Sequence, residues 1–123
     1  MEYSIKKEEK YIVIGLNEDK LDAVIAPELK SEFIKLDQEG FKNMILDLSE
    51  TKYIDSSGLS AILVANRLCS SNKGSFVITN ISEHITKLIT ISQLNSVLNI
   101  TKTNEEAVDL IFLNEMENDI NKG

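Results

Sequence analysis

Two apolar segments separated by a short polar junction place the strongest constraint on how this chain can fold. The run MILDL at residues 44–48 is nearly continuous in apolar side chains, which is typical of a strand covered on both faces, as in a parallel sheet. Residues 59–69 are apolar almost all round and long enough for a buried helix. A buried strand followed by a buried helix predicts a crossover unit, so we expect the junction YIDSSG at 53–58 to be a strand-to-helix loop.

Alternation and capping residues extend this pattern along the chain. Residues 3–16 predict two strands joined across KKEEK, of which the second is apolar on both faces and therefore central in its sheet. Residues 17–25 carry charges without a clean period and predict a loop. The remaining predicted elements are a helix that starts at Pro27 and stops at Gly40, helices over 56–71, 82–92 (capped by Ser82) and from 103 or 104 onward, and strands over 41–49, 75–80 and 97–100.

The predicted order is β-β-α-β-α-β-α-β-α. Strands that alternate with helices are joined by crossovers, so the order predicts an α/β fold with a mixed, mostly parallel sheet and helices packed mainly on one side. A length of 123 residues suits a single domain. We assign residues 1–113 to this domain and interpret 114–123 as the acidic end of the last helix or as a frayed tail.

Composition indicates a globular protein of the cytoplasm. The hydrophobic fraction is 42% and the charged fraction 27%, and no apolar run approaches the length of about 18 residues that a membrane span needs. The first ten residues, MEYSIKKEEK, contain no apolar signal-peptide core. A single cysteine, Cys69, cannot form an internal disulfide, which fits a reducing compartment.

The formal net charge of −7 is unevenly distributed. Six of the 20 acids lie between Asn104 and Asp119 with no base among them, whereas the other 14 acids are matched by 13 bases. An acidic chain without a basic stripe is not expected to bind nucleic acid directly. The acidic end is either a docking surface or a solvated helix face.

The polar junction predicts a surface site. Ser56 is placed to cap the following helix, and Gly58, which has no Cβ, would leave the first turn open to a close approach. Ser60 and Arg67 fall on one stripe with Ser56 at helical spacing, and this stripe is predicted to be the exposed side of an otherwise buried helix. In open α/β sheets, ligand and partner sites lie at the carboxyl ends of strands, where this junction falls.

Enzymatic motifs are missing from the sequence, so we do not expect catalysis, a cofactor or a metal site. The one histidine, His84, is predicted to be a surface residue of an amphipathic helix, and the junction does not match G-x-S-x-G. Neither a Cys/His cluster nor a phosphate-binding loop is present. A covalent modification fits better, because a phosphate on Ser56 would add about −1.5 to −2 charges at a helix N-terminus that favours anions.

The same residues carry a resemblance to a known family. The segment from MILDLS through YIDSSGL to the short strand VLNI resembles the core of the STAS domain, and in particular the bacterial anti-sigma factor antagonists. LDAVIAPELKSEF resembles the family's acidic loop and its first helix, which starts at a proline. The chain departs from the family's usual Gly-Glu pair before this loop, where Asp19 and Lys20 stand.

The resemblance implies a role for each residue of the junction. In the family, the serine after the aspartate, here Ser56, is phosphorylated by an anti-sigma factor that is also a serine kinase. The unphosphorylated antagonist binds this kinase and frees a sigma factor for transcription, and a serine phosphatase resets it. The residues expected to form the partner-binding surface are Asp22, Asp55, Ser56, Ser57, Gly58, Ser60 and Arg67.

Two hypotheses about function remain open from the sequence. One is a phosphorylatable switch in a partner-switching pathway. The other is a constitutive STAS adaptor of a transport or signalling complex that uses the same helix face without phosphorylation. Ser56 is compatible with both.

Overall fold

Seven strands and four helices make up the described part of the chain, residues 1–122, in the computed structural model. The strands are β1 (Tyr3–Lys7), β2 (Ile12–Leu16), β3 (Lys20–Leu21), β4 (Met44–Asp47), β5 (Tyr53–Ile54), β6 (Phe76–Thr79) and β7 (Asn99–Thr101). The helices are α1 (Ala26–Gln38), α2 (Ser56–Ser71), α3 (Glu83–Ile91) and α4 (Asn104–Lys122).

Five of the strands form one sheet in the order β1-β2-β4-β6-β7. β1 runs antiparallel to β2, and the other neighbours in this sheet are parallel. The prediction of a mixed, mostly parallel sheet is therefore confirmed, and so is the internal position of β2. β4 lies at the centre of the sheet.

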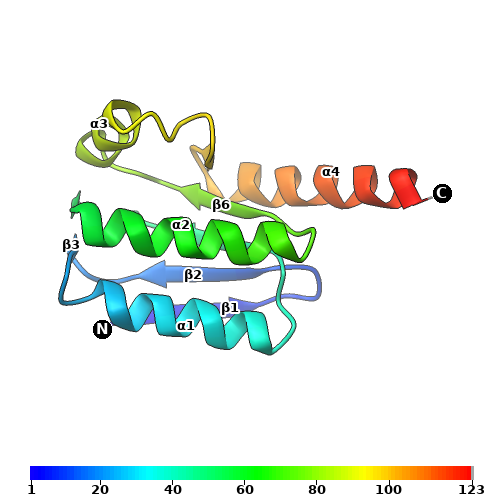
Figure 1. Ribbon diagram of the computed structural model, residues 1–123, viewed down its shortest axis with the longest axis horizontal. Helices are drawn as coiled ribbons and strands as arrows, with labels where there is room; N and C mark the ends of the chain where they lie inside the picture. Colours follow the sequence, from blue (N-terminus) through cyan, green and yellow to red (C-terminus); the bar gives the residue numbers. More distant parts are fainter. Residues whose placement is uncertain (123) are drawn as a thin grey trace.

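The two faces of the sheet bury different side chains. Met44 and Leu46 of β4 belong to the larger core cluster, together with residues of α1, α2 and α3, whereas Ile45 between them points to a smaller cluster with α4. Figure 1 shows α1 and α2 side by side in front of the strands, with α4 behind. Three helices thus pack with the larger cluster, which confirms helices mainly on one side, and a strand covered on both faces explains the unbroken apolar run.

Two short strands replace loops that the sequence predicts. β3 falls within residues 17–25 and pairs in parallel with β5, which falls within the 53–58 junction. The interpretation of both segments as irregular loops is therefore wrong at these four residues. A two-residue strand is too short to show a period of two, so alternation could not reveal it.

The helix ends also differ from the prediction. α1 begins one residue before Pro27, and Gly40 ends it with a φ of +99°. Residues 114–123 were interpreted as the end of the last helix or as a frayed tail, and α4 continues as a helix through Lys122. Two hydrogen bonds to the rest of the domain stabilise these last turns of α4. Asn114 Nδ2 donates to Ser75 Oγ (2.8 Å), and Asn118 Nδ2 donates to the carbonyl of Lys73 (2.9 Å).

A polar network ties the start of α4 to the ends of the central strands. Asn104 Nδ2 donates to Asp47 Oδ2 (3.1 Å), and Asn80 Nδ2 donates to Asp47 Oδ1 (3.1 Å). Burial acts to raise the pKa of Asp47, but hydrogen bonds from Ser49, Asn104 and Asn80 outweigh it and hold the pKa below its ordinary value. The ionised carboxylate is therefore the form that the folded chain stabilises.

Replacing Asp47 by Asn should destabilise the fold at neutral pH and much less in acid. The loss should be about 1–3 kcal/mol, because the new amide keeps only one accepting oxygen and turns an NH2 donor toward the other of the two donors, Asn80 Nδ2 or Asn104 Nδ2. Since the folded pKa of Asp47 is lowered, its contribution is present above the ordinary value of 3.8 and is lost as the pH falls through the folded value. Urea denaturation of both chains between neutral and acid pH measures this, with Asp119→Asn as an exposed control. A difference between Asp47→Asn and the parent that stays constant with pH would contradict it.

The packing of α2 predicts unequal costs for two neighbouring substitutions. Ile62 is fully buried between α2 and the sheet, so Ile62→Ala should cost about 2–5 kcal/mol by leaving a cavity. Ser60 lies half-buried near the surface, and Ser60→Ala should change the free energy of unfolding by no more than about 0.5 kcal/mol. Chemical denaturation compares the two variants directly. Equal losses would mean that α2 is rotated differently from the structure.

Candidate functional site

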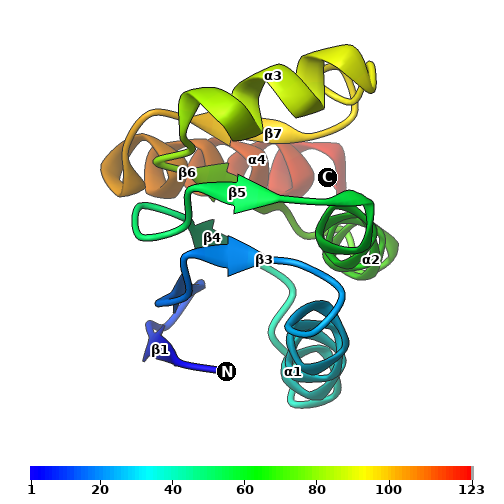
Figure 2. The same ribbon diagram turned by 90° about the vertical axis from the view of Figure 1, so that its left-hand side faces the viewer.

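The pair β3–β5 forms the frame of the YIDSSG junction. Lys20 pairs with Tyr53 and Leu21 with Ile54, and the amide of Asp55 continues the ladder by donating to the carbonyl of Leu21 (3.3 Å). Figure 2 shows the two strands side by side, leading directly to the start of α2 and to the segment before α1. Residues 17–25 and 53–58, distant in sequence, are therefore held together at this end of the molecule.

Asp55, and not Ser56, caps helix α2. Its backbone is extended, and its Oδ1 accepts from the amide of Gly58 (3.0 Å). The expectation that Ser56 is the cap is therefore wrong by one residue, although an aspartate satisfies the first-turn amides as well as a serine does. Ser56 becomes the first residue of the helix and is exposed. Because the carboxylate of Asp55 makes the capping bond, that role does not fall to the Ser56 hydroxyl.

Gly58 serves the packing of the domain itself. It is buried, and a Cβ built on it would lie 2.3 Å from the carbonyl oxygen of Leu21. The close approach that its missing side chain permits is thus made by β3 of the same chain. Our expectation that Gly58 opens the first turn to a partner is not what the structure shows, and Gly58 takes part in the site by setting the distance between β3 and α2.

The stripe along α2 contains one apolar residue that the sequence placed elsewhere. Ser56 and Arg67 are exposed, as expected, and Ser60 is half-buried. Leu63, which belongs to the apolar run predicted to form a buried helix, is also only half-buried. The steps of four, three and four from Ser56 to Ser60, Leu63 and Arg67 return to one side of the helix. The exposed side of α2 is therefore polar at both ends with an apolar residue in the middle.

Ser56 faces a shallow hollow between α1 and α2. Ser56, Ser57 and Ser60 line one wall, and the other wall comes from the start of α1 and the segment before it, including Ala23 and Lys30. Lys30 is the one charged residue that lines this hollow. The sequence analysis missed Lys30, because only the packing of α1 against α2 brings it near the junction.

A larger cleft of about 510 Å³ adjoins the junction on its other side. Asp22 and Asp55, which the sequence analysis assigned to one surface, both line it. Asp22 Oδ1 also accepts from the amide of Val24 (3.0 Å), which orders the segment before α1. The structure therefore brings these two carboxylates to one cleft, with the Ser56 hollow beside it.

An aromatic pair forms part of the same cleft and was not predicted. The ring of His84, at the start of α3, stands edge-on to Tyr53 of β5 with 5.1 Å between centroids. His84 is exposed, as expected for a surface residue of an amphipathic helix, but the sequence gave no reason to place it near the junction. Of the two rings, only that of Tyr53 could be assigned to the junction from the sequence, because Tyr53 belongs to the YIDSSG motif itself.

Within residues 1–122, no group of three or more His, Cys, Asp or Glu side chains is placed to hold a metal ion. None of the helices described is long and apolar enough to cross a membrane. Burial raises the pKa of the Cys69 thiol to about 12, so this thiol stays protonated near neutral pH.

Comparison with known proteins defines the family. The STAS domain model matches residues 3–107, and the chain therefore belongs to the STAS domain family. The anti-sigma-B factor antagonist of Bacillus subtilis (strain 168) is 25% identical over 104 residues, which cover 85% of this chain and 94% of that protein.

Solved structures bear out the fold. The crystal structure of tm1081 from Thermotoga maritima matches with a TM-score of 0.81 at 23% identity, covering 89% of this chain and 93% of that one. The Bacillus cell fate determinant SpoIIAA in its phosphorylated form matches with a TM-score of 0.70 at 21% identity, covering 89% and 99%. At these identities the two structures establish the α/β architecture of the domain.

Adding a side chain at Gly58 should disturb the junction. Gly58→Ala is expected to destabilise the fold by about 1–3 kcal/mol, because its Cβ would meet the backbone of β3, which cannot move without breaking the β3–β5 ladder. Gly15→Ala is the matched control, since its Cβ would meet only the Ser4 hydroxyl (2.8 Å), which can rotate away. Denaturation curves of both variants give the comparison. A Gly58→Ala chain as stable as Gly15→Ala would contradict the assigned role.

Proposed function

We propose that the chain is a cytoplasmic anti-sigma factor antagonist in which Ser56 is the phosphorylated switch. The observation that carries this proposal is the position of Ser56. Ser56 is the exposed first residue of α2, next to Asp55, whose carboxylate already caps the helix. It is also the serine of the D-S-S-G-L motif that family members modify. The partners we propose are an anti-sigma factor with serine kinase activity and a serine phosphatase. The chain itself is proposed to be a regulator without catalytic activity of its own.

The geometry favours Ser56 over Ser57 as the modified residue. Ser56 is exposed, whereas Ser57 is half-buried one helical step of about 100° further round. A kinase must reach the hydroxyl in line with the γ-phosphate of ATP, which an exposed residue at a helix start permits. The transfer breaks the bond between the β–γ bridging oxygen and the γ-phosphorus, forms a bond from Ser56 Oγ to that phosphorus, and releases ADP and a proton.

The electrostatics of the junction allow a phosphate without loss of the fold. The start of α2 favours an anion by about 0.3–1 kcal/mol, and Lys30 lines the hollow that Ser56 faces. The carboxylate of Asp55 opposes this with its own charge. The fold should therefore tolerate the phosphate, while the potential of the exposed surface becomes much more negative.

A phosphate at this position would act on binding. The partner surface proposed around Ser56 includes the carboxylates of Asp22 and Asp55 in the adjoining cleft. A dianion buried there against a partner costs free energy unless basic groups meet it. Phosphorylation would then release the partner without unfolding the antagonist.

Incubation with a cognate anti-sigma kinase and ATP should phosphorylate Ser56 and not Ser57, as mass spectrometry of the digested chain will show. The phosphoprotein should bind that kinase more weakly than the unmodified chain in a titration. Ser56→Ala should stay folded and bind constitutively, and Ser56→Asp should bind weakly, because its carboxylate adds charge at the same position. Ser57→Ala is the matched control and should be phosphorylated as the parent is.

Two outcomes would contradict the proposal. Modification confined to Ser57 would overturn the site assignment. Undiminished binding by the phosphoprotein would favour a constitutive adaptor that uses the same surface without a switch.

A further inference from the structure

The outer face of α4 carries an apolar surface that the rest of the domain leaves uncovered. Phe112, Leu113, Met116 and Ile120, which we call the α4 stripe, are 42%, 57%, 59% and 73% exposed. The side of α4 that packs on the sheet carries Ala107 and Ile111, about half a turn away from Met116 at 100° per residue. Isolated exposed apolar residues are common, but four that share one side of a helix form a patch of the kind that marks an interaction site.

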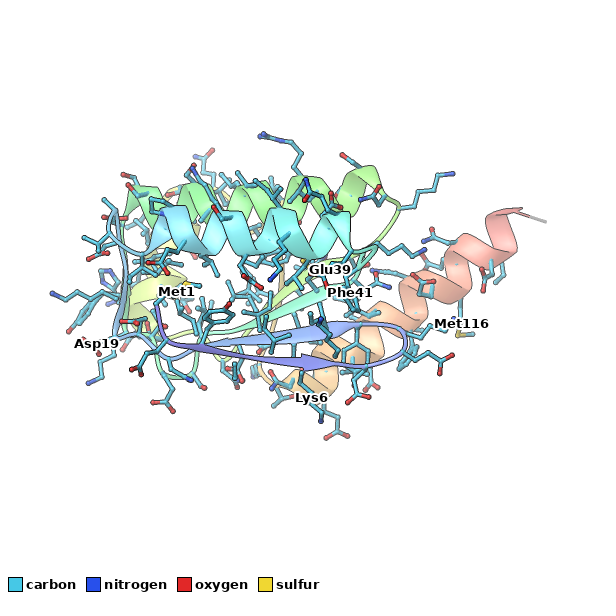
Figure 3. The ribbon with its side chains drawn as sticks, turned by 90° about the horizontal axis from the view of Figure 1, so that it is seen from below. Met1, Lys6, Asp19, Glu39, Phe41 and Met116 are labelled. Atoms are coloured by element: carbon cyan, nitrogen blue, oxygen red, sulfur yellow. The ribbon has the colours of Figure 1, made fainter. Side chains whose placement is uncertain are left out.

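The position of the stripe in the molecule makes it accessible. Figure 1 shows α4 extending past the ends of the strands and of α2, and in Figure 3 Met116 lies on the length of the helix beyond the β1–β2 hairpin. At its inner end the ring of Phe112 stands edge-on to Tyr11, the residue before β2, with 6.2 Å between centroids. The stripe therefore starts at the body of the domain and continues outward along a helix that Asn114 and Asn118 fix in place from the other side.

The charges around the stripe identify the chemistry of its partner. Glu117 and Asp119 flank it on its two sides, and Glu105 and Asp109 continue its line toward the start of α4; all four are exposed. The segment from Asn104 to Asp119 contains no base. A partner that covers the apolar centre must therefore bring positive charge to its rim.

The same charges argue against a second copy of this chain. Two α4 helices packed through their stripes would place acidic flanks against acidic flanks, and like charges held close together across an interface are unfavourable. The stripe spans nine residues from Phe112 to Ile120, and the eight steps between them cover about 12 Å along a helix axis. This length suits two or three turns of another helix laid against it, with apolar residues three and four apart.

We propose that the α4 stripe is a docking surface for a basic amphipathic helix of a protein partner. The surface lies on the face of the sheet opposite to α1 and α2, so this proposal does not depend on Ser56 or on its phosphorylation. The apolar side of the partner helix covers Leu113, Met116 and Ile120. Lysine or arginine side chains at its edges face the acids of α4.

A designed peptide tests the proposal. The probe is a helical peptide with leucines spaced three and four apart and lysines and arginines on both flanks, and binding is followed by fluorescence anisotropy. A peptide of the same composition in scrambled order controls for the overall negative charge of the chain, and a version with glutamates in place of the bases controls for the apolar face alone. The wild-type chain should bind the first peptide, with affinity that falls as salt is raised, and should bind the other two at least about tenfold more weakly.

Substitutions then locate the binding surface. The triple variant Leu113→Gln/Met116→Gln/Ile120→Gln should lose affinity about tenfold or more, whereas Ile91→Gln, which changes a residue 78% exposed on α3, should leave it unchanged. Asp109→Asn/Glu117→Gln should weaken binding and flatten its salt dependence. Unfolding curves establish that each variant is folded.

Several results would overturn the proposal. These are equal binding of the scrambled peptide, no binding of the amphipathic peptide, or undiminished binding by the triple variant when it is folded. A dimer of the wild-type chain in sedimentation velocity that the triple variant abolishes would also overturn it, because the stripe would then be the contact between two copies.

Discussion

The junction of this domain depends on one backbone contact, the approach of the first turn of α2 to β3. Gly58 makes it possible, because any side chain there would collide with the carbonyl of Leu21. That contact fixes α2 against β3, and the β3–β5 ladder in turn fixes the segment before α1. The carboxylate of Asp55 then closes the turn by capping α2 at the amide of the same glycine. Ser56 is consequently held on the surface by a rigid scaffold, which is what the proposed phosphorylation switch would require.

The main elements of the fold could be predicted because each is coded locally. The apolar run of β4 indicates burial on both faces, and the cap at Ser82 is found where the sequence predicts it, with its hydroxyl accepting from the amide of Ile85 (3.2 Å). The cap of α2 was misassigned because aspartate and serine are about equally good caps and stand next to each other. The end of α4 stayed open in the sequence analysis, because its last turns are stabilised by Asn114 and Asn118, whose partners lie some 40 residues away in the sequence. Local propensity cannot report such contacts.

The residues of the candidate site that lie in recognisable sequence motifs could be predicted, whereas those that only tertiary packing brings there could not. Asp22 and Asp55 were assigned to one surface, and the structure places both in one cleft. Lys30 and His84 were missed because each is an ordinary surface residue in its own helix and reaches the junction only through tertiary packing. Gly58 was selected because it lacks a Cβ, which is the property that matters, but the expected close contact was with a partner and the observed one is with Leu21 of β3. Sequence thus identified the residue types that the junction needs, while the packing of α1 and α3 decided which further residues surround it.

The two surfaces considered above lie on opposite sides of one sheet, and this arrangement limits how they can influence each other. Coupling between sites requires an element with two arrangements that both sites bias. The strands between α2 and α4 are closely packed on both faces, and α4 is tied to their ends by hydrogen bonds to Asp47 and Ser75. The proposed phosphate on Ser56 would change the charge on the α2 side, away from these hydrogen bonds. Binding at the α4 stripe would therefore persist through a cycle of phosphorylation and dephosphorylation. A partner attached there would keep this chain at a high effective concentration near a second component, even while the Ser56 surface exchanges the partners proposed for it.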